Sequence, residues 1–351
     1  MKKQTGNLSR RHFLGKSAAV VASASLLPLN YGCGGGTAST NAFANPNSKS
    51  SDTKSSGPII GVSTYSFRDI PGGFENVVNY CKEVDLNTIE VLGVDMEIFL
   101  GKPEVPFADK YPFIKTFGPA VLAYLNIQVP AEEKKLFDKY EKDLKEWRLG
   151  LSMPEMEKAR TFLQEKGIDA HAGNPSMSGN SDEEVEYGFK LTKAMGAEAL
   201  ISEIDYDNVK RLAPFAEKYG IKLALHNHKQ FAAEGFDLDA ILALSPLVML
   251  NFDVGNYYGS TGKHPNDILK KYYDRVYSIH LKDMTAPTTT PPNTNQVWGQ
   301  GQTPLGDVLT LINKEQWPIF CDIELEYEIK PWSDPINEVK KCICFMKQYL
   351  G

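Results

Sequence analysis

Short runs rich in β-branched and aromatic residues alternate with amphipathic helical stretches along most of this chain, and this alternation constrains the fold more than any other feature. It repeats eight times from Pro58 onward, which predicts parallel strands, right-handed helical crossovers and closure into an α/β (β/α)8 TIM barrel. The predicted strands are 59–67, 88–93, 168–174, 198–204, 222–228, 248–256, 276–283 and 319–326. The predicted helices are 73–84, 154–166, 182–195, 208–219, 237–244, 264–273, 304–314 and 335–349.

A doubly wound open sheet is the alternative fold for such an alternation. That fold usually carries a glycine-rich turn after its first strand, whereas this chain has Ser63-Thr64-Tyr65-Ser66 there. We therefore expect residues 58–351 to form one barrel domain. Residues 95–151 exceed a normal connection and include a charged helical piece at 131–147, so we predict an insertion after the second strand that covers part of the barrel mouth.

The amino terminus has the pattern of an export signal. Arg10-Arg11 precedes a short apolar stretch at residues 18–29, which is typical of the twin-arginine route, so residues 1–33 are predicted to be a signal. Cys33 follows at a loose lipoprotein cleavage site, and residues 34–57 are rich in Gly, Ser, Thr and Asn, as in a flexible tether. The sequence thus predicts a periplasmic protein or an envelope-anchored lipoprotein, with a membrane tether if Cys33 is lipidated.

The charge of the chain argues against a nucleic-acid partner. The formal net charge is −6, and the first 32 residues hold five basic residues and no acidic one, which leaves −11 on the remainder (−6 minus 5). Such an acidic surface repels phosphate backbones, so we expect a small-molecule partner instead.

Ionisable residues cluster towards one end of the predicted strands, where the interior of a barrel otherwise favours Val, Ile and Leu. The carboxyl ends of barrel strands are where barrel enzymes place their active sites. The residues that we assign to this end are His171, Glu203, His226, His228, Asp253, Asn256, His280, Lys282, Glu324 and Glu326.

Four of these residues make the best set of metal ligands: His226, Asp253, His280 and Glu324. Imidazole together with carboxylate suits Mn²⁺, Zn²⁺, Co²⁺ or Fe²⁺ better than Mg²⁺. His226 and His228 are two positions apart on a strand and face the same side, so that one can bind metal while the other orients it or contacts substrate.

The strand ends Leu225-His226-Asn227-His228, Phe252-Asp253-Val254-Gly255-Asn256, Ile279-His280-Leu281-Lys282-Asp283 and Ile323-Glu324-Leu325-Glu326 resemble those of the xylose-isomerase-like barrel family of sugar isomerases and epimerases. In its ketose epimerases Glu, Asp, His and Glu bind the metal, and the two glutamates also move the proton. The resemblance implies that Asp253, His280 and Glu324 are ligands. His226 stands where Glu is expected and Asn256 where many members have His, which puts a plain 3-epimerase activity in doubt.

The predicted chemistry starts from a divalent cation that chelates a carbonyl and the adjacent hydroxyl, which acidifies the intervening C–H and stabilises an enediolate. The predicted catalytic residues are Glu324 as base, with His226, His228 and Lys282 in proton transfer. The predicted substrate contacts are His171, Glu203, His228, Asn256, Lys282 and Trp298, the last by stacking on a sugar ring.

The predicted function is therefore a metal-dependent sugar isomerase or epimerase that acts on a carbohydrate or keto-sugar. Two alternatives stay open. One is a metal-dependent 3-keto-glycoside lyase or hydrolase of the same fold, in which loss of a β-oxygen follows proton removal. The other is a non-catalytic carbohydrate-binding lipoprotein, which the histidine at position 226 supports. A nuclease of the same superfamily is disfavoured because its three-zinc site needs more histidines than the four that remain in the strands.

Overall fold

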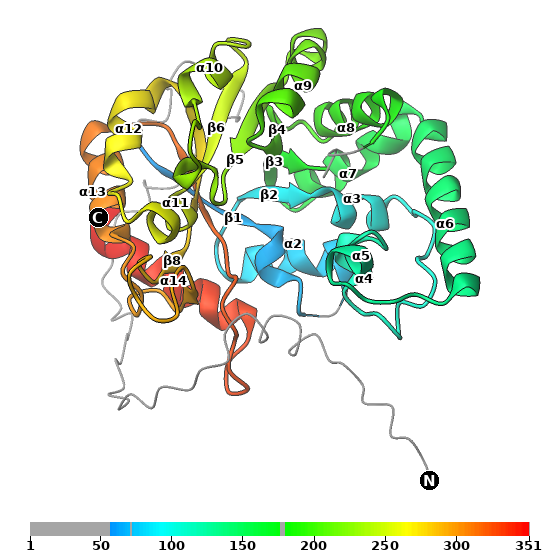
Figure 1. Ribbon diagram of the computed structural model, residues 1–351, viewed down its shortest axis with the longest axis horizontal. Helices are drawn as coiled ribbons and strands as arrows, with labels where there is room; N and C mark the ends of the chain where they lie inside the picture. Colours follow the sequence, from blue (N-terminus) through cyan, green and yellow to red (C-terminus); the bar gives the residue numbers. More distant parts are fainter. Residues whose placement is uncertain (1–56, 71, 176–179, 351) are drawn as a thin grey trace.

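Eight parallel strands close into a barrel in this structure, a computed structural model that describes residues 57–70, 72–175 and 180–350 (Figure 1). The predicted export signal, Cys33 and all but the last residue of the predicted tether lie outside the described residues. The strands are hydrogen-bonded in the order β1-β10-β7-β6-β5-β4-β3-β2, with β2 closing onto β1. Their bounds are β1 Ile59–Ser63, β2 Thr88–Leu92, β3 Asp169–Asn174, β4 Ala199–Glu203, β5 Lys222–His226, β6 Val248–Asp253, β7 Val276–Leu281 and β10 Phe320–Ile323.

Helices surround the barrel, as the alternation predicts, and the predicted TIM-barrel fold is confirmed (Figure 1). They are α2 Gly73–Glu83, α7 Met153–Glu165, α8 Asp182–Ala194, α9 Tyr206–Tyr219, α10 Leu238–Leu242, α12 Asn266–Tyr272, α13 Leu305–Glu315 and α14 Pro335–Leu350. Two of them begin with a capping box: Ser152 with Glu155 starts α7, and Ser181 with Glu184 starts α8. Among the described residues no helix is long and apolar enough to span a membrane.

The alternation of side chains along each strand explains why the polar residues reach the barrel interior. In β5, Leu223 and Leu225 join the large apolar cluster that includes the surrounding helices, whereas Ala224 joins a small inner cluster with Ala199. His226 is two positions after Ala224 in the strand, so its side chain faces the same side and also points inward, at the carboxyl end of the strand. β5 therefore places the small apolar Ala224 deeper in the barrel and the ionisable His226 nearer the mouth.

Every strand except β3 ends one to four residues earlier than predicted, and in β1 and β6 a helix takes the place of the missing residues. β1 ends at Ser63, and residues 64–67 form a 3-10 helix, Thr64–Phe67. β6 ends at Asp253, and a helix, α11 (Val254–Thr261), follows at once. The Asp253 carboxylate accepts a hydrogen bond from the backbone N–H of Asn256 at 2.7 Å, so this acid caps the helix and ends the strand.

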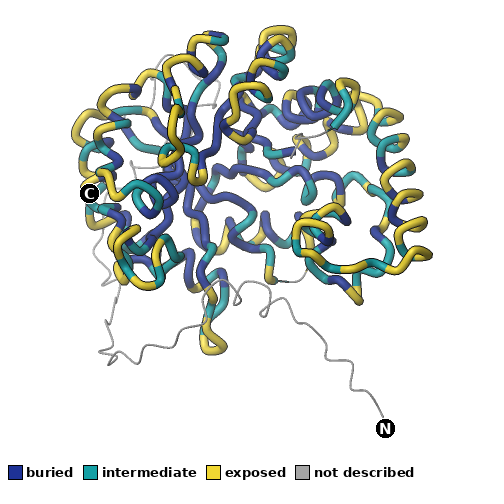
Figure 2. The backbone as a smooth tube through the Cα atoms, in the orientation of Figure 1, coloured by how far each residue is buried: buried dark blue, intermediate teal, exposed yellow. Residues whose placement is uncertain are grey.

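The predicted insertion after β2 is present and consists of four helices: α3 Gly93–Phe99, α4 Ile114–Phe117, α5 Val121–Tyr124 and α6 Ala131–Gly150. It has an apolar cluster of its own, which includes Ile114, Leu122, Phe137 and Leu144. Figure 2 shows that α6 is exposed along its outer side, at the edge of the molecule away from the barrel. The insertion is thus an independently packed lobe beside the barrel mouth.

A long loop after β7 is folded around one carboxylate. Its two short strands, β8 (Asp283–Met284) and β9 (Asn295–Gln296), pair antiparallel. The Asp283 carboxylate accepts hydrogen bonds from the backbone N–H groups of Gly299, Gly301 and Thr303 at 2.8 to 3.1 Å. A Cβ at Gly301 would lie 2.1 Å from Asp283 Oδ1, so only glycine permits this close approach.

Candidate active site

Three of the four predicted metal ligands lie together at the carboxyl ends of β5, β6 and β7. One ligand atom each of His226, Asp253 and His280 lies within 4.8 Å of the others, and all three residues are buried. His226 Nε2 is 3.8 Å from Asp253 Oδ2. Glu324 directly follows β10, and its Oε2 lies 3.0 Å from His280 Nδ1. The structure therefore brings together all four side chains that the sequence assigns to a metal.

Hydrogen bonding fixes the tautomer of His226. Asn251 Nδ2 donates to Glu90 Oε2 at 3.0 Å and to Ser278 Oγ at 2.7 Å, so Asn251 Oδ1 is left as an acceptor. That oxygen lies 2.9 Å from His226 Nδ1, which must therefore carry the proton. Burial lowers the pKa of His226 and keeps the ring neutral. His226 Nε2 thus presents a lone pair towards Asp253, as a metal ligand must.

Glu90, on β2, is a further candidate residue of the site, which the sequence analysis missed. Its Oε2 lies 2.8 Å from His280 Nε2, so His280 bridges Glu90 on one side and Glu324 on the other. Burial lowers the pKa of His280, but the charges of Glu90 and Glu324 outweigh it and raise that pKa well above its ordinary value. A carboxylate behind a ligating histidine is the usual device that orients the ring towards a metal. The sequence signal that could have identified Glu90 was the presence of an acidic residue inside the otherwise apolar run Thr88–Leu92.

Lys282 is buried at the centre of the carboxylates. Its Nζ lies 2.8 Å from Asp253 Oδ2, 2.6 Å from Glu324 Oε2 and 2.8 Å from Glu326 Oε2, and the side chain is 2% exposed. Burial lowers the pKa of Lys282, but Asp253, Glu324 and Glu326 raise it well above the ordinary value, so the side chain is an ammonium. The ammonium therefore neutralises the carboxylates from within.

The donor set fits a divalent cation. Donors that are each about 2.1 Å from a shared ion lie roughly 3 to 4 Å apart, and the distances of 3.0 Å and 3.8 Å between the predicted ligands fall in that range. Four carboxylates are buried here, on Glu90, Asp253, Asp322 and Glu324, against two buried cations, the ammonium of Lys282 and the imidazolium of His280. The surplus of negative charge favours binding a cation, although two of the same carboxylate oxygens are already in contact with the ammonium of Lys282.

Asn256, a predicted substrate contact, supports Asp253 and does not line the cavity in front of the ligands. Its side-chain amide donates to Asp253 Oδ2 at 2.8 Å and to the backbone oxygen of Asn227 at 3.2 Å. Asn227 in turn accepts from the backbone N–H of Asp253 at 2.9 Å. Because α11 starts immediately after β6, position 256 is turned back onto Asp253 instead of pointing into the mouth.

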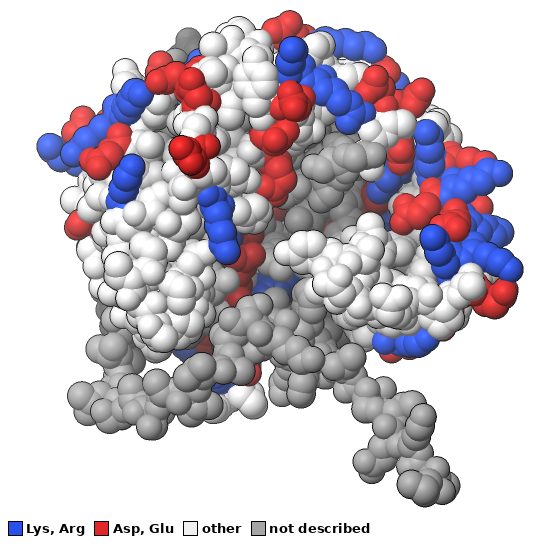
Figure 3. All heavy atoms as spheres, in the orientation of Figure 1, with Lys and Arg blue, Asp and Glu red and all other residues white. Residues whose placement is uncertain are grey.

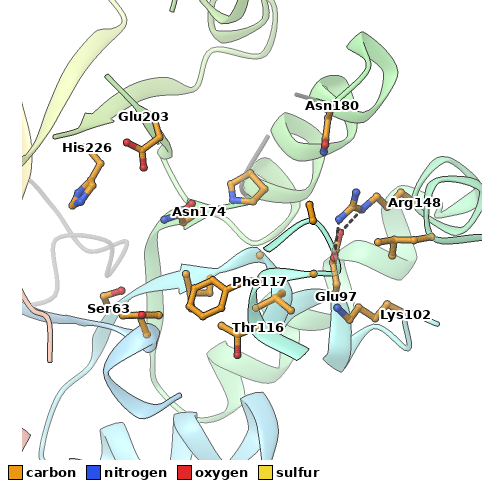
Figure 4. Close-up of a pocket in the computed structure, with 18 of the residues that line it drawn as sticks. Ser63, Glu97, Lys102, Thr116, Phe117, Arg148, Asn174, Asn180, Glu203 and His226 are labelled. Atoms are coloured by element: carbon orange, nitrogen blue, oxygen red, sulfur yellow. Dashed lines mark hydrogen bonds and ion pairs between the residues drawn. The ribbon is translucent and has the colours of Figure 1, made fainter. Parts of the chain in front are cut away.

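A cavity of about 440 Å³ opens in front of these ligands, between the barrel and the insertion. Figure 3 shows the molecule hollowed at this place, beside the largely uncharged lobe of α4 and α5. His226, Glu203 and Ser63 lie at the barrel end of the cavity and Glu97, Lys102 and Arg148 at the insertion end (Figure 4). His228, His280, Glu324 and Glu326 also line it.

A histidine–carboxylate pair stands at the mouth of the barrel. His228 Nε2 lies 3.1 Å from Glu203 Oε1, and both side chains are about half exposed. The hydrogen bond to Glu203 raises the pKa of His228, while burial partly opposes it. Both residues line the cavity, so the structure places them where the sequence assigns substrate contacts.

His171 does not lie at the mouth, where the sequence analysis placed it as a substrate contact. It is the third residue of β3, and its ring stacks on Phe320 with centroids 4.1 Å apart. Its nitrogens lie 3.0 Å from Thr88 Oγ1 and 3.0 Å from Asp322 Oδ2. It lines a separate cavity at the amino-terminal ends of the strands, with Ile59 and Phe320.

Trp298, which the sequence analysis placed on a sugar ring, does not line the cavity either. The indole is 8% exposed and packs edge-to-face on Phe345 of α14, with centroids 5.7 Å apart. The loop around Asp283 folds the indole inward onto the outer helices. The aromatic side chains that do line the cavity include Tyr65 and Phe117, and Phe117 comes from the insertion.

Comparison with known proteins agrees with this geometry. A family model described as "Xylose isomerase-like TIM barrel" matches residues 137–349. An inosose dehydratase from Clostridium beijerinckii is 35% identical over 83 residues, which is 23% of this chain and 28% of that protein. The match thus spans little more than a quarter of the curated relative.

Two solved structures share the fold over most of the chain. The probable 3-DHS dehydratase AsbF of Bacillus anthracis superposes with a TM-score of 0.53 at 12% identity, covering 82% of this chain and 97% of that one. The IOLI protein with a bound zinc atom gives a TM-score of 0.52 at 13% identity, covering 83% and 98%. The family model spans more than half of the chain, and the barrel carries its polar residues at the expected strand ends; the chain belongs to the xylose isomerase-like TIM-barrel family.

Proposed function

We propose that this protein is a metal-dependent lyase that removes the proton next to a carbonyl of a polyhydroxylated ring and then expels a β-oxygen, as a dehydratase does. One arrangement carries the proposal: three of the four cation donors, His226, His280 and Glu324, line the same cavity as the His228–Glu203 pair, and Asp253 lies buried beside His226 and His280. The names of two similar proteins, inosose dehydratase and probable 3-DHS dehydratase, belong to this reaction class.

His226, Asp253, His280 and Glu324 would hold the cation. When bound, a divalent cation supplies a Lewis acid that polarises a carbonyl oxygen and stabilises the negative charge that develops there. Nitrogen and oxygen donors together favour Zn²⁺, Mn²⁺, Co²⁺ or Fe²⁺ over Mg²⁺, and the structurally similar IOLI protein binds a zinc atom.

The chain's own residues divide the proton transfers between them. Glu324 uses Oε2 to contact His280 and Lys282, which leaves Oε1 outside those contacts to take the proton from carbon. The electron pair of that C–H bond forms the enolate and then the C=C bond, while the β C–O bond breaks. His228, whose pKa is raised by its hydrogen bond to Glu203, donates a proton to the departing oxygen. Carbon thus loses a proton and the oxygen gains one, and with a hydroxyl as leaving group the second product is water.

The replacement of the expected glutamate by His226 favours this lyase over an epimerase. An epimerase that works with two glutamates needs a second carboxylate base on the opposite face of the substrate, and His226 cannot supply one. An isomerase would share the first proton removal but return the proton to the neighbouring carbon. The alternative of a 3-keto-glycoside lyase follows the same steps with a glycosidic oxygen as the leaving group.

The test is proton NMR of cyclic polyhydroxy ketones, beginning with an inosose, incubated in D2O with Zn²⁺- or Mn²⁺-loaded protein. We expect metal-dependent loss of the α-proton signal together with a new unsaturated product. Asp253→Asn should abolish both. His228→Gln should keep the α-proton exchange but slow elimination by about 10²- to 10⁴-fold.

The matched control is His264→Gln, because His264 pairs with Asp307 at 3.3 Å in a similarly exposed setting outside the cavity. It should behave as the unmodified protein. Exchange into a saturated product would identify an isomerase or epimerase. Absence of exchange with every ketone, or exchange that ignores the metal, would contradict the proposal and leave carbohydrate binding as the function.

A further inference from the structure

The cavity is larger than one sugar ring requires. Its volume is about 440 Å³. Even if each of the twelve non-hydrogen atoms of a hexose took the roughly 30 Å³ of a liquid water molecule, part of that space would stay unfilled. The remaining space lies at the insertion end, where Lys102, Tyr140, Glu141 and Arg148 form the wall.

The charges at the insertion end do not suit a phosphate. Arg148 is committed to other partners: it lies 2.6 and 3.2 Å from the two oxygens of Glu97 and 3.1 Å from Glu184. The side-chain ammonium of Lys102 forms no hydrogen bond or ion pair with a described residue, but Glu97 and Glu141 stand near it and offset its charge. The two cations, Arg148 and Lys102, stand among three carboxylates, on Glu97, Glu141 and Glu184. This end of the cavity therefore has no net positive charge with which to bind a phosphate dianion. These charged side chains do offer both donors and acceptors, which is what the hydroxyls of a neutral ring need.

An exposed aromatic ring stands between the two ends of the cavity. Phe117 is 45% exposed, and its ring meets Tyr65 edge-to-face with centroids 6.2 Å apart. Both residues line the cavity, and in Figure 4 the Phe117 ring lies between Ser63 at the barrel end and the Glu97–Arg148 pair. A large apolar ring left open to solvent on a cavity wall is suited to stack on the C–H face of a second sugar ring.

We infer that the insertion forms a second subsite, so that the substrate is an uncharged glycoside with one ring at the strand ends and another on Phe117. This inference rests on the proposed function for the first ring. The second ring contacts Phe117 and Tyr65 by stacking and reaches Lys102 and Glu141 with its hydroxyls. A free monosaccharide fills only the first subsite, and a sugar phosphate meets no available pair of cations.

The inference is tested by calorimetric binding to the full, Zn²⁺-loaded chain, which needs no turnover. The probes are methyl glucoside, the disaccharides cellobiose, maltose and lactose, and glucose 6-phosphate. At least one disaccharide should bind about tenfold more tightly than methyl glucoside, and glucose 6-phosphate should gain nothing. Phe117→Ala should remove about 2- to 10-fold of the disaccharide affinity and leave the monosaccharide unchanged.

Tyr124→Ala is the matched control, because Tyr124 is an aromatic residue of the same insertion that is 84% exposed and does not line the cavity. It should change nothing. The inference is overturned if no disaccharide binds more tightly than methyl glucoside, if glucose 6-phosphate binds best, or if Phe117→Ala weakens both sugar sizes equally. Any of these results would leave the proposed lyase intact, whereas failure of metal-dependent exchange in the NMR test would remove the lyase and leave the two-ring binding site standing.

Discussion

Replacement of Lys282 by Met tests whether this ammonium stands in for a cation among the site carboxylates. Methionine keeps much of the length of the side chain but removes the charge that now lies within 2.8 Å of Asp253, Glu324 and Glu326. Without it, carboxylates that are buried or nearly so face one another with no fixed positive partner. The variant should therefore be less stable without metal and should bind a divalent cation more tightly.

The magnitude follows from the burial of the site. Removing one partner of a buried ion pair destabilises a protein by about 3–5 kcal/mol, and Lys282 is 2% exposed, so solvent screens little of it. In a large domain each kcal/mol lowers the melting temperature by about 2–4 °C, which predicts a fall on the order of 10 °C. Metal at 100 times its dissociation constant returns about 2.7 kcal/mol, which is half or more of the loss.

The assay is urea unfolding of the full chain after treatment with a chelator, repeated with excess Zn²⁺, with zinc affinity measured by calorimetry. Lys340→Met is the matched control, because Lys340 pairs with Glu83 at 2.8 Å on the exposed surface; it should change the unfolding free energy by less than about 1 kcal/mol. If Lys282→Met were as stable as the unmodified protein without metal, and bound zinc no more tightly, the role assigned to the ammonium would be refuted.

Three other substitutions test named contacts. Glu90→Gln should weaken metal binding by about 10- to 100-fold, because the carboxylate that orients His280 is lost; calorimetry that shows unchanged affinity would contradict this. Gly255→Ala should destabilise the fold by about 1–3 kcal/mol, because the new Cβ would lie 2.6 Å from the backbone oxygen of Lys282. Gly150→Ala, in open space on α6, should be neutral or stabilising. Equal effects of the two variants in urea unfolding would count against the packing argument. Burial raises the pKa of Asp95 to about 6, so the folded state binds an extra proton between about pH 4 and 6, and the free energy of unfolding falls as the pH rises through that window. Asp95→Asn should remove that fall, which is worth at most about 3 kcal/mol, when unfolding is measured at pH 4.5 and pH 7.5. An unchanged difference between the two pH values would rule the assignment out.

The barrel and the meeting of the candidate metal ligands were predictable because both depend on regular features of the sequence. The alternation of strands and helices predicts a closed parallel sheet. Side chains alternate along a strand, so His226, Asp253 and His280 all face the barrel interior at the strand ends and meet there. The sequence did not show in the same way where a helix begins inside a predicted strand. The change at Asp253 depends on a side chain that caps the next helix, and a run of β-branched and aromatic residues hides such a cap.

The surroundings of the ligands were less predictable because they depend on depth and on contacts between distant segments. His171 was assigned to the mouth although it lies three residues before the end of β3, where Thr88 and Asp322 bind it deep in the barrel. Glu90 was overlooked because a single acid in an apolar strand carries no periodic signal, and its role appears only when β2 and β7 face each other across the interior. The burial of Lys282 likewise depends on acids from two other strands.

The insertion was foreseen as a segment that covers part of the mouth, but its contribution to the cavity was not. Phe117 and Arg148 are distant in sequence from every strand that supplies a ligand, and only the packing of the lobe against the barrel brings them to the same cavity. The aromatic residue that the sequence favoured, Trp298, is instead buried against Phe345.

The proposed chemistry depends on one divalent cation shared by His226, Asp253, His280 and Glu324. Anomalous diffraction at the zinc edge, from crystals of the Zn²⁺-loaded protein, would locate that ion. We predict a single strong peak at the strand ends, about 2.0–2.2 Å from His226 Nε2, His280 Nδ1 and oxygens of Asp253 and Glu324. A zinc peak elsewhere would contradict the shared site. So would the absence of a peak, with the ammonium of Lys282 still between the carboxylates.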